Sequence, residues 1–122
     1  MKITDKIKSF EDACAHLNIS TELPIINMIP GLHAKSLIAY YKLIIIIQAL
    51  NEGWVPNWLN NSEYKWFNWF YFDSAGFACS YSICAASNTH SHLGSRLCFK
   101  SEELTDYARE KFEDLYKEYL LF

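Results

Sequence analysis

The stretch LIAYYKLIIIIQALNEG, residues 37–53, is the part of the chain that decides the fold. Its run of four isoleucines would suit a buried strand as well as a helix. The apolar stretch is too long for a typical strand, however, and Gly53 stands where a glycine commonly follows the end of a helix. We therefore predict a helix from about residue 32 to residue 51. Because apolar residues occupy nearly every face, this helix should form the buried centre of the domain.

The same run bears on the compartment. Residues 37–50 include Lys42 and Gln48, whereas a helix that crosses a bilayer needs about 20 predominantly apolar residues. Charged residues also interrupt the first 17 positions, so no apolar segment of a secretory signal is present there. We expect a soluble cytosolic protein that makes no membrane contact. Its four cysteines are then expected to be free thiols.

The amino-acid composition further limits the structural class and the kinds of partner to expect. The chain of 122 residues is 51% hydrophobic and 16% aromatic, which argues against disorder and predicts a single domain over residues 1–122. The formal net charge is −3. That balance argues against general nucleic-acid binding, which needs a cationic surface to displace counterions, but it leaves a local basic patch open.

Two further helices carry capping signals. Ser9 is followed three residues later by Asp12, a variant of the capping box, and predicts a helix over about 10–18. Ser101 is a good N-cap and precedes two glutamates, which the helix dipole favours in a first turn. An apolar stripe at helical spacing then predicts one long C-terminal helix.

Three strands are predicted between these helices. Aromatic enrichment indicates a strand at 63–72, period-two alternation indicates a second at 77–85, and a short third strand is predicted at 95–99. The resulting fold class is α+β. It has two N-terminal helices, a three-stranded antiparallel meander and a long C-terminal helix, with the helices packed on one face of the sheet. The intervening loops and turns are predicted at 53–62, 73–76 and 86–94.

All four tryptophans fall between residues 54 and 69. Alternation along the strand at 63–72 points rings to both of its sides, and one layer of helices covers only one side. Three explanations remain open. The loop at 53–62 could fold over part of the second face and complete a two-sided core. An aromatic face could instead stay open and meet a protein partner, often another copy of the chain, or it could stack single-stranded bases.

Metal and thiol chemistry have weak support. The spacing of Cys79 and Cys84 would point them to opposite faces of a regular strand, and no C-x-x-C pair occurs. His90 and His92 lie in a predicted loop, where either could meet Cys98 as a base, but no third residue is evident to orient the pair. We therefore expect no metal, no cofactor and no catalytic residue, and keep a small thiol enzyme only as a third class of function.

Four stretches carry a family resemblance: SFEDACAHL (9–17), LIAYYKLIIIIQALNEGWVPNW (37–58), SEYKWFNWF (62–70) and GSRLCFKSEELTDYAREKFEDLYKEYL (94–120). Together they resemble a family of small uncharacterised proteins encoded by phages and prophages of Bacteroides and related gut bacteria. The resemblance implies a mobile-element product that acts in a bacterial cytoplasm or is associated with the virion. It brings no activity and no site residue with it.

The sequence thus favours a non-enzymatic binding or assembly module that uses an aromatic sheet surface. A protein partner or self-association is expected, and the alternative is a single-stranded nucleic-acid accessory protein that stacks bases on the same rings. The residues predicted to form this surface are Trp58, Lys65, Phe67, Trp69, Tyr71 and Arg96.

Overall fold

A computed structural model describes residues 1–60, 62–73, 76–85 and 94–121, and for residues 71–73 and 76–85 it describes the backbone. In chain order the elements are α1 (Ile3–Lys6), α2 (Phe10–Leu17), α3 (Gly31–Leu50), β1 (Lys65–Asp73), β2 (Gly76–Ala85), the 3₁₀ helix η1 (Ser95–Leu97), α4 (Glu102–Lys111) and α5 (Glu113–Leu121). Helical residues outnumber strand residues in this part of the chain.

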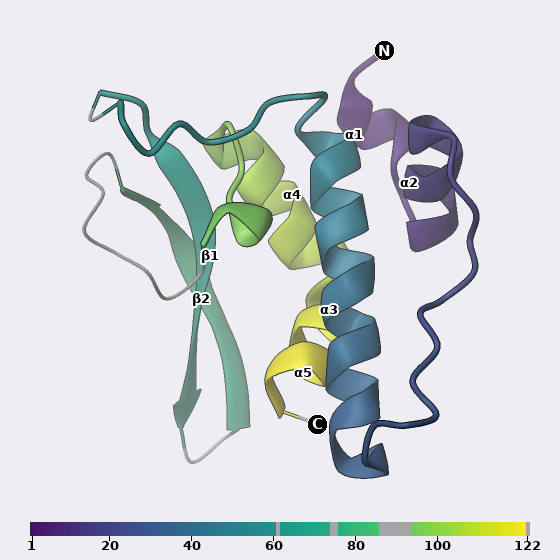
Figure 1. The fold of residues 1–122 in the computed structure, drawn as a ribbon. Helices are drawn as coiled ribbons and strands as arrows, with labels where there is room; N and C mark the ends of the chain where they lie inside the picture. The colour runs from purple at the N-terminus through teal and green to yellow at the C-terminus, as the bar shows by residue number, and fades with distance from the viewer. Residues whose placement is uncertain (61, 74–75, 86–93, 122) are drawn as a thin grey trace.

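Helix α3 is the centre of the molecule (Figure 1). Helices α1 and α2 lie on one side of it, and α4, α5 and the ribbon of β1 and β2 lie on the other. The prediction of a buried central helix is confirmed for its C-terminal part, where Leu43, Ile46 and Leu50 are buried. The first turns of α3 differ, because Leu32 is exposed.

The predicted caps hold two of the surrounding helices. The Ser9 hydroxyl accepts a hydrogen bond from the backbone N–H of Asp12 at 3.0 Å and starts α2. Phe10 in the first turn of α2 then packs edge-on against Tyr41 of α3. The Ser101 hydroxyl accepts from the N–H of Leu104 in the same way and starts α4.

The predicted three-stranded meander is wrong. Within the described residues the sheet has only two strands, β1 and β2, paired antiparallel, and the residues predicted as a third strand begin as the 3₁₀ helix η1. Only Phe99 makes a β-bridge, and its partner is Trp66 of β1. The helices therefore pack around α3 and against a narrow ribbon, rather than forming a layer on one face of a sheet.

The side chain of Asn51 explains why the third strand does not form. Asn51 follows α3 and is buried, and its amide donates to the carbonyl of Cys98 at 2.9 Å and accepts from the backbone N–H of Lys100 at 3.0 Å. Those two peptide groups point away from β1, whereas Phe99 between them faces Trp66. The segment is thus shared between a helix end and a strand and cannot extend as a regular strand.

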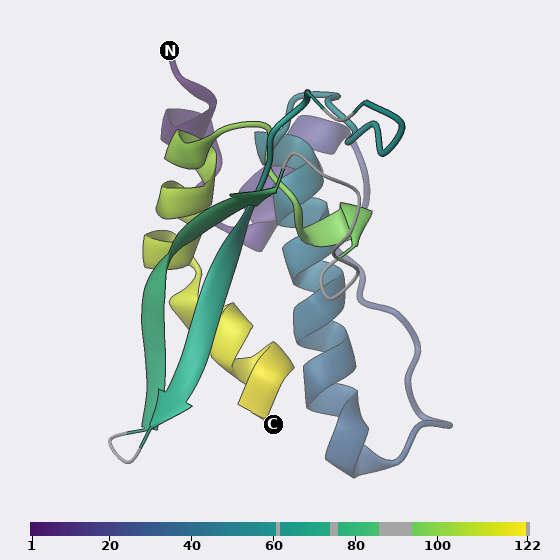
Figure 2. The ribbon, with the colours of Figure 1, turned by 90° about the vertical axis from the view of Figure 1, so that its left-hand side faces the viewer.

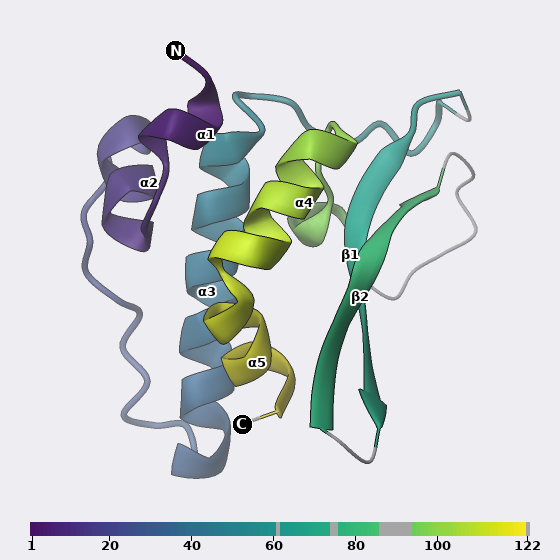
Figure 3. The ribbon, with the colours of Figure 1, turned by 180° about the vertical axis from the view of Figure 1, so that it is seen from behind.

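The C-terminal helix is also different from the prediction, because it breaks into α4 and α5 at Phe112. The backbone of Phe112 leaves the helical region, with φ −117° and ψ 28°, and its ring is buried against Tyr107. The change of direction lets α4 contact the ribbon while α5 packs along α3 (Figure 3), where the rings of Tyr40 and Tyr119 stack at 5.0 Å.

We predict that Asn51→Ala lowers the free energy of unfolding by about 2–4 kcal/mol, because it leaves a buried carbonyl and a buried N–H without partners. Urea denaturation followed by circular dichroism measures the change. Gln48→Ala, at an exposed position of the same helix, is the matched control and should change stability by less than about 0.5 kcal/mol. Equal losses in the two variants would contradict the role given to Asn51.

Candidate binding surface

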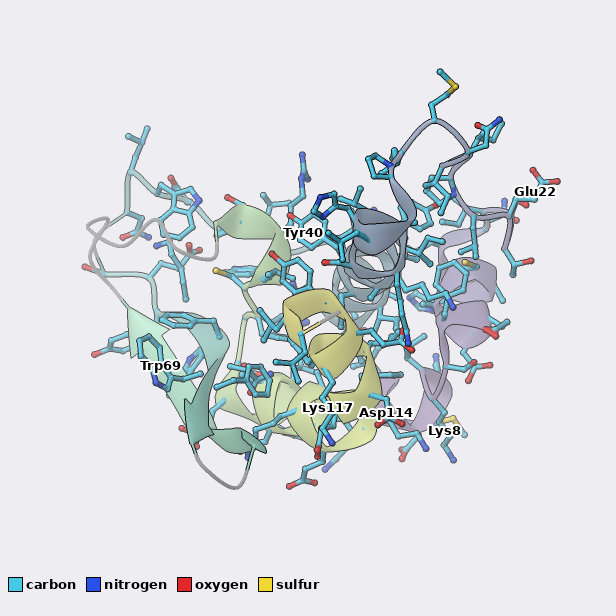
Figure 4. The ribbon with its side chains drawn as sticks, turned by 90° about the horizontal axis from the view of Figure 1, so that it is seen from below. Lys8, Glu22, Tyr40, Trp69, Asp114 and Lys117 are labelled. Atoms are coloured by element: carbon cyan, nitrogen blue, oxygen red, sulfur yellow. The ribbon has the colours of Figure 1, made fainter. Side chains whose placement is uncertain are left out.

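The two faces of β1 have different surroundings. The amide of Asn68 donates to the carbonyl of Thr105 in α4 and to the hydroxyl of Tyr116 in α5, and the ring of Phe70 lies 4.8 Å from that of Tyr116. Alternation along a strand therefore places Lys65, Phe67 and Trp69 on the opposite face. Figure 4 shows Trp69 on the side of the ribbon away from α5.

Along this opposite face, exposure increases from one end to the other. Lys65 is 1% exposed, Phe67 is 6% exposed and Trp69 is 39% exposed. The buried end lies beside the loop that precedes β1, and the exposed end lies further along the strand. We call this face of β1, together with Trp58 and Arg96, the outer face; Lys65 and Phe67 form its buried part.

A latch centred on Glu63 closes the loop onto β1. Its carboxylate accepts hydrogen bonds from the backbone N–H of Asn57 at 2.7 Å and from the indole N–H of Trp54 at 3.3 Å, and it pairs with the Lys65 ammonium at 3.3 Å. The N–H of Asn57 is the largest of the influences that hold the pKa of Glu63 below its ordinary value, and Lys65 and Trp54 act in the same direction. One carboxylate thus fixes both ends of the loop.

The Lys65 ammonium is enclosed by this loop. It donates to the carbonyl oxygens of Asn60 at 3.2 Å and Glu63 at 3.1 Å, and it lies 5.2 Å from the ring centroid of Trp58. A buried ammonium needs such partners because desolvation is costly. Lys65 therefore organises the loop and is buried, whereas the sequence predicted it as part of the binding surface.

Trp58 links the loop to η1. Its indole N–H donates to the hydroxyl of Ser95, and Arg96, the next residue, is exposed. Beside them a groove of about 290 Å³ runs between the C-terminal half of α3, the loop residues 54–56 and η1. Its walls are mainly apolar, and Arg96 lies at its η1 side.

The structure brings most of the predicted surface together. Trp58 contacts both Lys65 of β1 and Ser95 of η1, Arg96 follows Ser95 in the chain, and Phe67 and Trp69 continue along the strand. Tyr71 lies in β1, but its side chain is outside what the structure describes. Sequence reasoning missed Glu63 and Ser95, which hold the surface in place. For Glu63, the sequence offers one signal, a carboxylate at the end of a polar loop and two residues before Lys65.

The two described thiols are buried. Burial raises the pKa of Cys98 to about 11, and its thiol donates to the carbonyl of Gly94 at 3.1 Å. Burial also raises the pKa of Cys14. Among the residues that the structure describes, no three His, Cys, Asp or Glu side chains are placed to hold a metal ion. The predicted loop with His90 and His92, and the side chains of Cys79 and Cys84, lie outside the described part.

Comparisons of the chain with protein-family models, with curated proteins and with solved structures found no match. Across the described ranges, none of the helices is both long enough and apolar enough to cross a membrane.

Glu63 should make stability depend on pH. Because its folded pKa is lowered, its contribution is complete above the unfolded value of about 4.5 and is lost as the pH falls through the folded pKa. We predict that Glu63→Gln costs about 1–2 kcal/mol at pH 7 and flattens the decline in stability below pH 4.5. Urea denaturation at pH 3 to 7 measures both effects, and Glu22→Gln, at an exposed position of the connection before α3, is the control.

The buried thiols give a second prediction. Cys98 and Cys14 should be alkylated at pH 7.5 at least about a hundredfold more slowly than in urea-unfolded protein, because little thiolate forms and access is blocked. Peptide mapping after timed exposure to iodoacetamide measures each site. Fast alkylation of Cys98 in folded protein would revive the thiol-enzyme class.

Proposed function

We propose that this protein is a non-enzymatic binding or assembly module that engages a protein partner through the outer face. The observation that carries the proposal is Trp69, a tryptophan 39% exposed on a strand that is anchored on its other side by Asn68 and Phe70. Partly exposed tryptophans are frequent anchors of protein interfaces. Two more large apolar side chains, Val55 and Leu59, are exposed in the latched loop, at 73% and 95%.

The latch supports this proposal energetically. Ordering a flexible loop during binding costs conformational entropy. A loop that is already fixed in the free protein loses less conformational entropy when it binds. Glu63 and Lys65 hold the loop through backbone groups of Asn57 and Asn60, so the exposed apolar residues are presented by a constrained segment. The groove beside Arg96 gives a partner a concave surface with a cationic border.

The same geometry favours a protein over single-stranded nucleic acid. Base-stacking surfaces combine rings with cations that contact phosphates. The Lys65 ammonium is buried and paired with Glu63, so it does not face solvent as a phosphate contact would. On the resemblance of its sequence, we place the protein among phage or prophage products that act in the bacterial cytoplasm or on virion parts.

Site-specific photocrosslinking tests the proposal. A photoreactive phenylalanine analogue at position 69 should capture a defined protein from host and phage lysate, whereas the same probe at exposed Glu22 should not. Once the partner is purified, Trp69→Ser should weaken its binding by about 2 kcal/mol, or roughly thirtyfold in Kd. Arg96→Ala should weaken it less, because exposed charges contribute little.

Two outcomes would overturn it. One is an identical capture pattern at positions 69 and 22. The other is salt-dependent binding of a labelled oligonucleotide that Trp69→Ser abolishes, which would assign the surface to nucleic acid.

A further inference from the structure

One edge of the second strand of the ribbon pairs with no other strand that the structure describes, and we call it the open edge. Among the described residues the sheet contains β1 and β2 alone, and the bridge to Phe99 falls on β1. In Figure 2 the lower part of β2 forms the outer border of the molecule, with no other element drawn alongside it. This edge is a different surface from the outer face and does not depend on the proposed function.

The sequence of β2 lacks the charged residues and prolines that commonly protect exposed edges. Its ten residues, GFACSYSICA, include no charged residue and no proline. Natural edge strands that must avoid pairing commonly carry lysine, proline, an inward-pointing charge or a β-bulge, or are very short. Of these features β2 has the bulge at Ser80 and none of the others. The absence of charged residues and prolines leaves the backbone groups of this edge accessible for pairing.

The backbone register shows which peptide groups point to this edge. Trp66 exchanges both of its backbone hydrogen bonds with Phe99, so it makes none with Cys84, its opposite residue in β2. In an antiparallel pair, hydrogen-bonded and non-hydrogen-bonded positions alternate. The peptide groups of Cys84 and Ser82 therefore point away from β1, toward the open edge.

A β-bulge changes this alternation further along β2. Trp69 pairs with Tyr81 and Phe70 pairs with Cys79, so Ser80 is an extra residue. Beyond it, the groups that point outward are those of Cys79 and Phe77, opposite Phe70 and Phe72. The outward-pointing positions are thus Phe77, Cys79, Ser82 and Cys84.

Successive outward-pointing positions are two, three and two residues apart. This order of spacings is the same whether the strand is followed forwards or backwards. An antiparallel copy of β2 can therefore match all four positions, with residue 77 opposite residue 84 and residue 79 opposite residue 82. A partner strand without a bulge would match only one half of the edge. The edge is self-complementary in its hydrogen bonds.

We propose that β2 pairs antiparallel with β2 of a second copy in this register and forms a continuous four-stranded sheet across a two-fold axis. Each matched pair exchanges two backbone hydrogen bonds, and the two bulges lie opposite each other at the centre. The contact uses the same surface of both copies, so it closes as a dimer and does not propagate into a fibre.

Hydrogen exchange combined with sedimentation tests the proposal on the unmodified protein. Sedimentation equilibrium should show a dimer. At concentrations where it forms, the amide protons of Phe77, Cys79, Ser82 and Cys84 should exchange at least about tenfold more slowly than in dilute protein. The amides of Tyr81 and Ile83, which face β1, should be protected equally at both concentrations. A monomer at all concentrations, or a dimer without this contrast, would overturn the proposal.

Two variants test the register. Ser82→Pro removes an outward donor and no hydrogen bond within the ribbon, so it should raise the dimer Kd at least about tenfold, while Ser82→Ala should not.

Ser82→Cys should form a disulfide with Cys79 of the second copy, because the Cα atoms of such a pair lie about 5.5 Å apart. Failure of Ser82→Cys to crosslink in a dimeric protein, with Ser80→Cys as control, would reject this register. If Ser82→Pro does not fold, the exchange measurement decides. Loss of the dimer in Ser82→Pro with capture through position 69 retained would show that the two surfaces are separate.

Discussion

The buried amide of Asn51 is the interaction on which the rest of the structure depends. It fixes the segment 97–100 against the end of α3 by taking the carbonyl of Cys98 and the N–H of Lys100. Phe99 between them is then free to exchange hydrogen bonds with Trp66, which sets the position of β1. Because Ser95 in the adjoining turn accepts from Trp58, the latched loop also takes its position from this segment.

Much of the fold was predictable because its signals are local. A few neighbouring residues are enough to predict four of the elements, and the structure confirms these four. The signals are the caps at Ser9 and Ser101, the apolar run of α3 and the alternation of β2. Two of the failures have distant causes. The local sequence at 95–99 predicts a strand. Asn51, which is remote in sequence, prevents it by hydrogen bonding to peptide groups of this segment. The sequence around Phe112 contains neither glycine nor proline, so nothing local marks the break between α4 and α5.

The tryptophans illustrate the same division for the candidate site. Trp66 packs against the core, and Trp54 and Trp58 are held in the latched loop, which covers the Lys65 end of the outer face. Among the four tryptophans, all of which the structure describes, Trp69 is the most exposed, at 39%. The structure places Trp58, Lys65, Phe67 and Trp69, which the pattern singled out, along β1 and the loop that precedes it. The sequence pattern could not predict that Lys65 is buried. The Lys65 ammonium is satisfied by the carbonyls of Asn60 and Glu63, and the positions of these carbonyls depend on the path of the loop.

The proposed dimer would change what the outer face offers to a partner. A two-fold axis perpendicular to a sheet keeps each face on its own side, so both copies of Trp69 would project from the same side of the four-stranded sheet. Strands in a sheet are about 4.8 Å apart, which separates the two β1 strands by about 14 Å. A partner with two-fold or repeated symmetry, such as an assembling ring or shell, could then contact both rings together. Its second contact would be intramolecular, so two individually weak surfaces would bind with an avidity that neither has alone. The self-complementary edge and the exposed tryptophan are separate features of the ribbon, and in the proposed dimer both would contribute to contacts with such a symmetric partner.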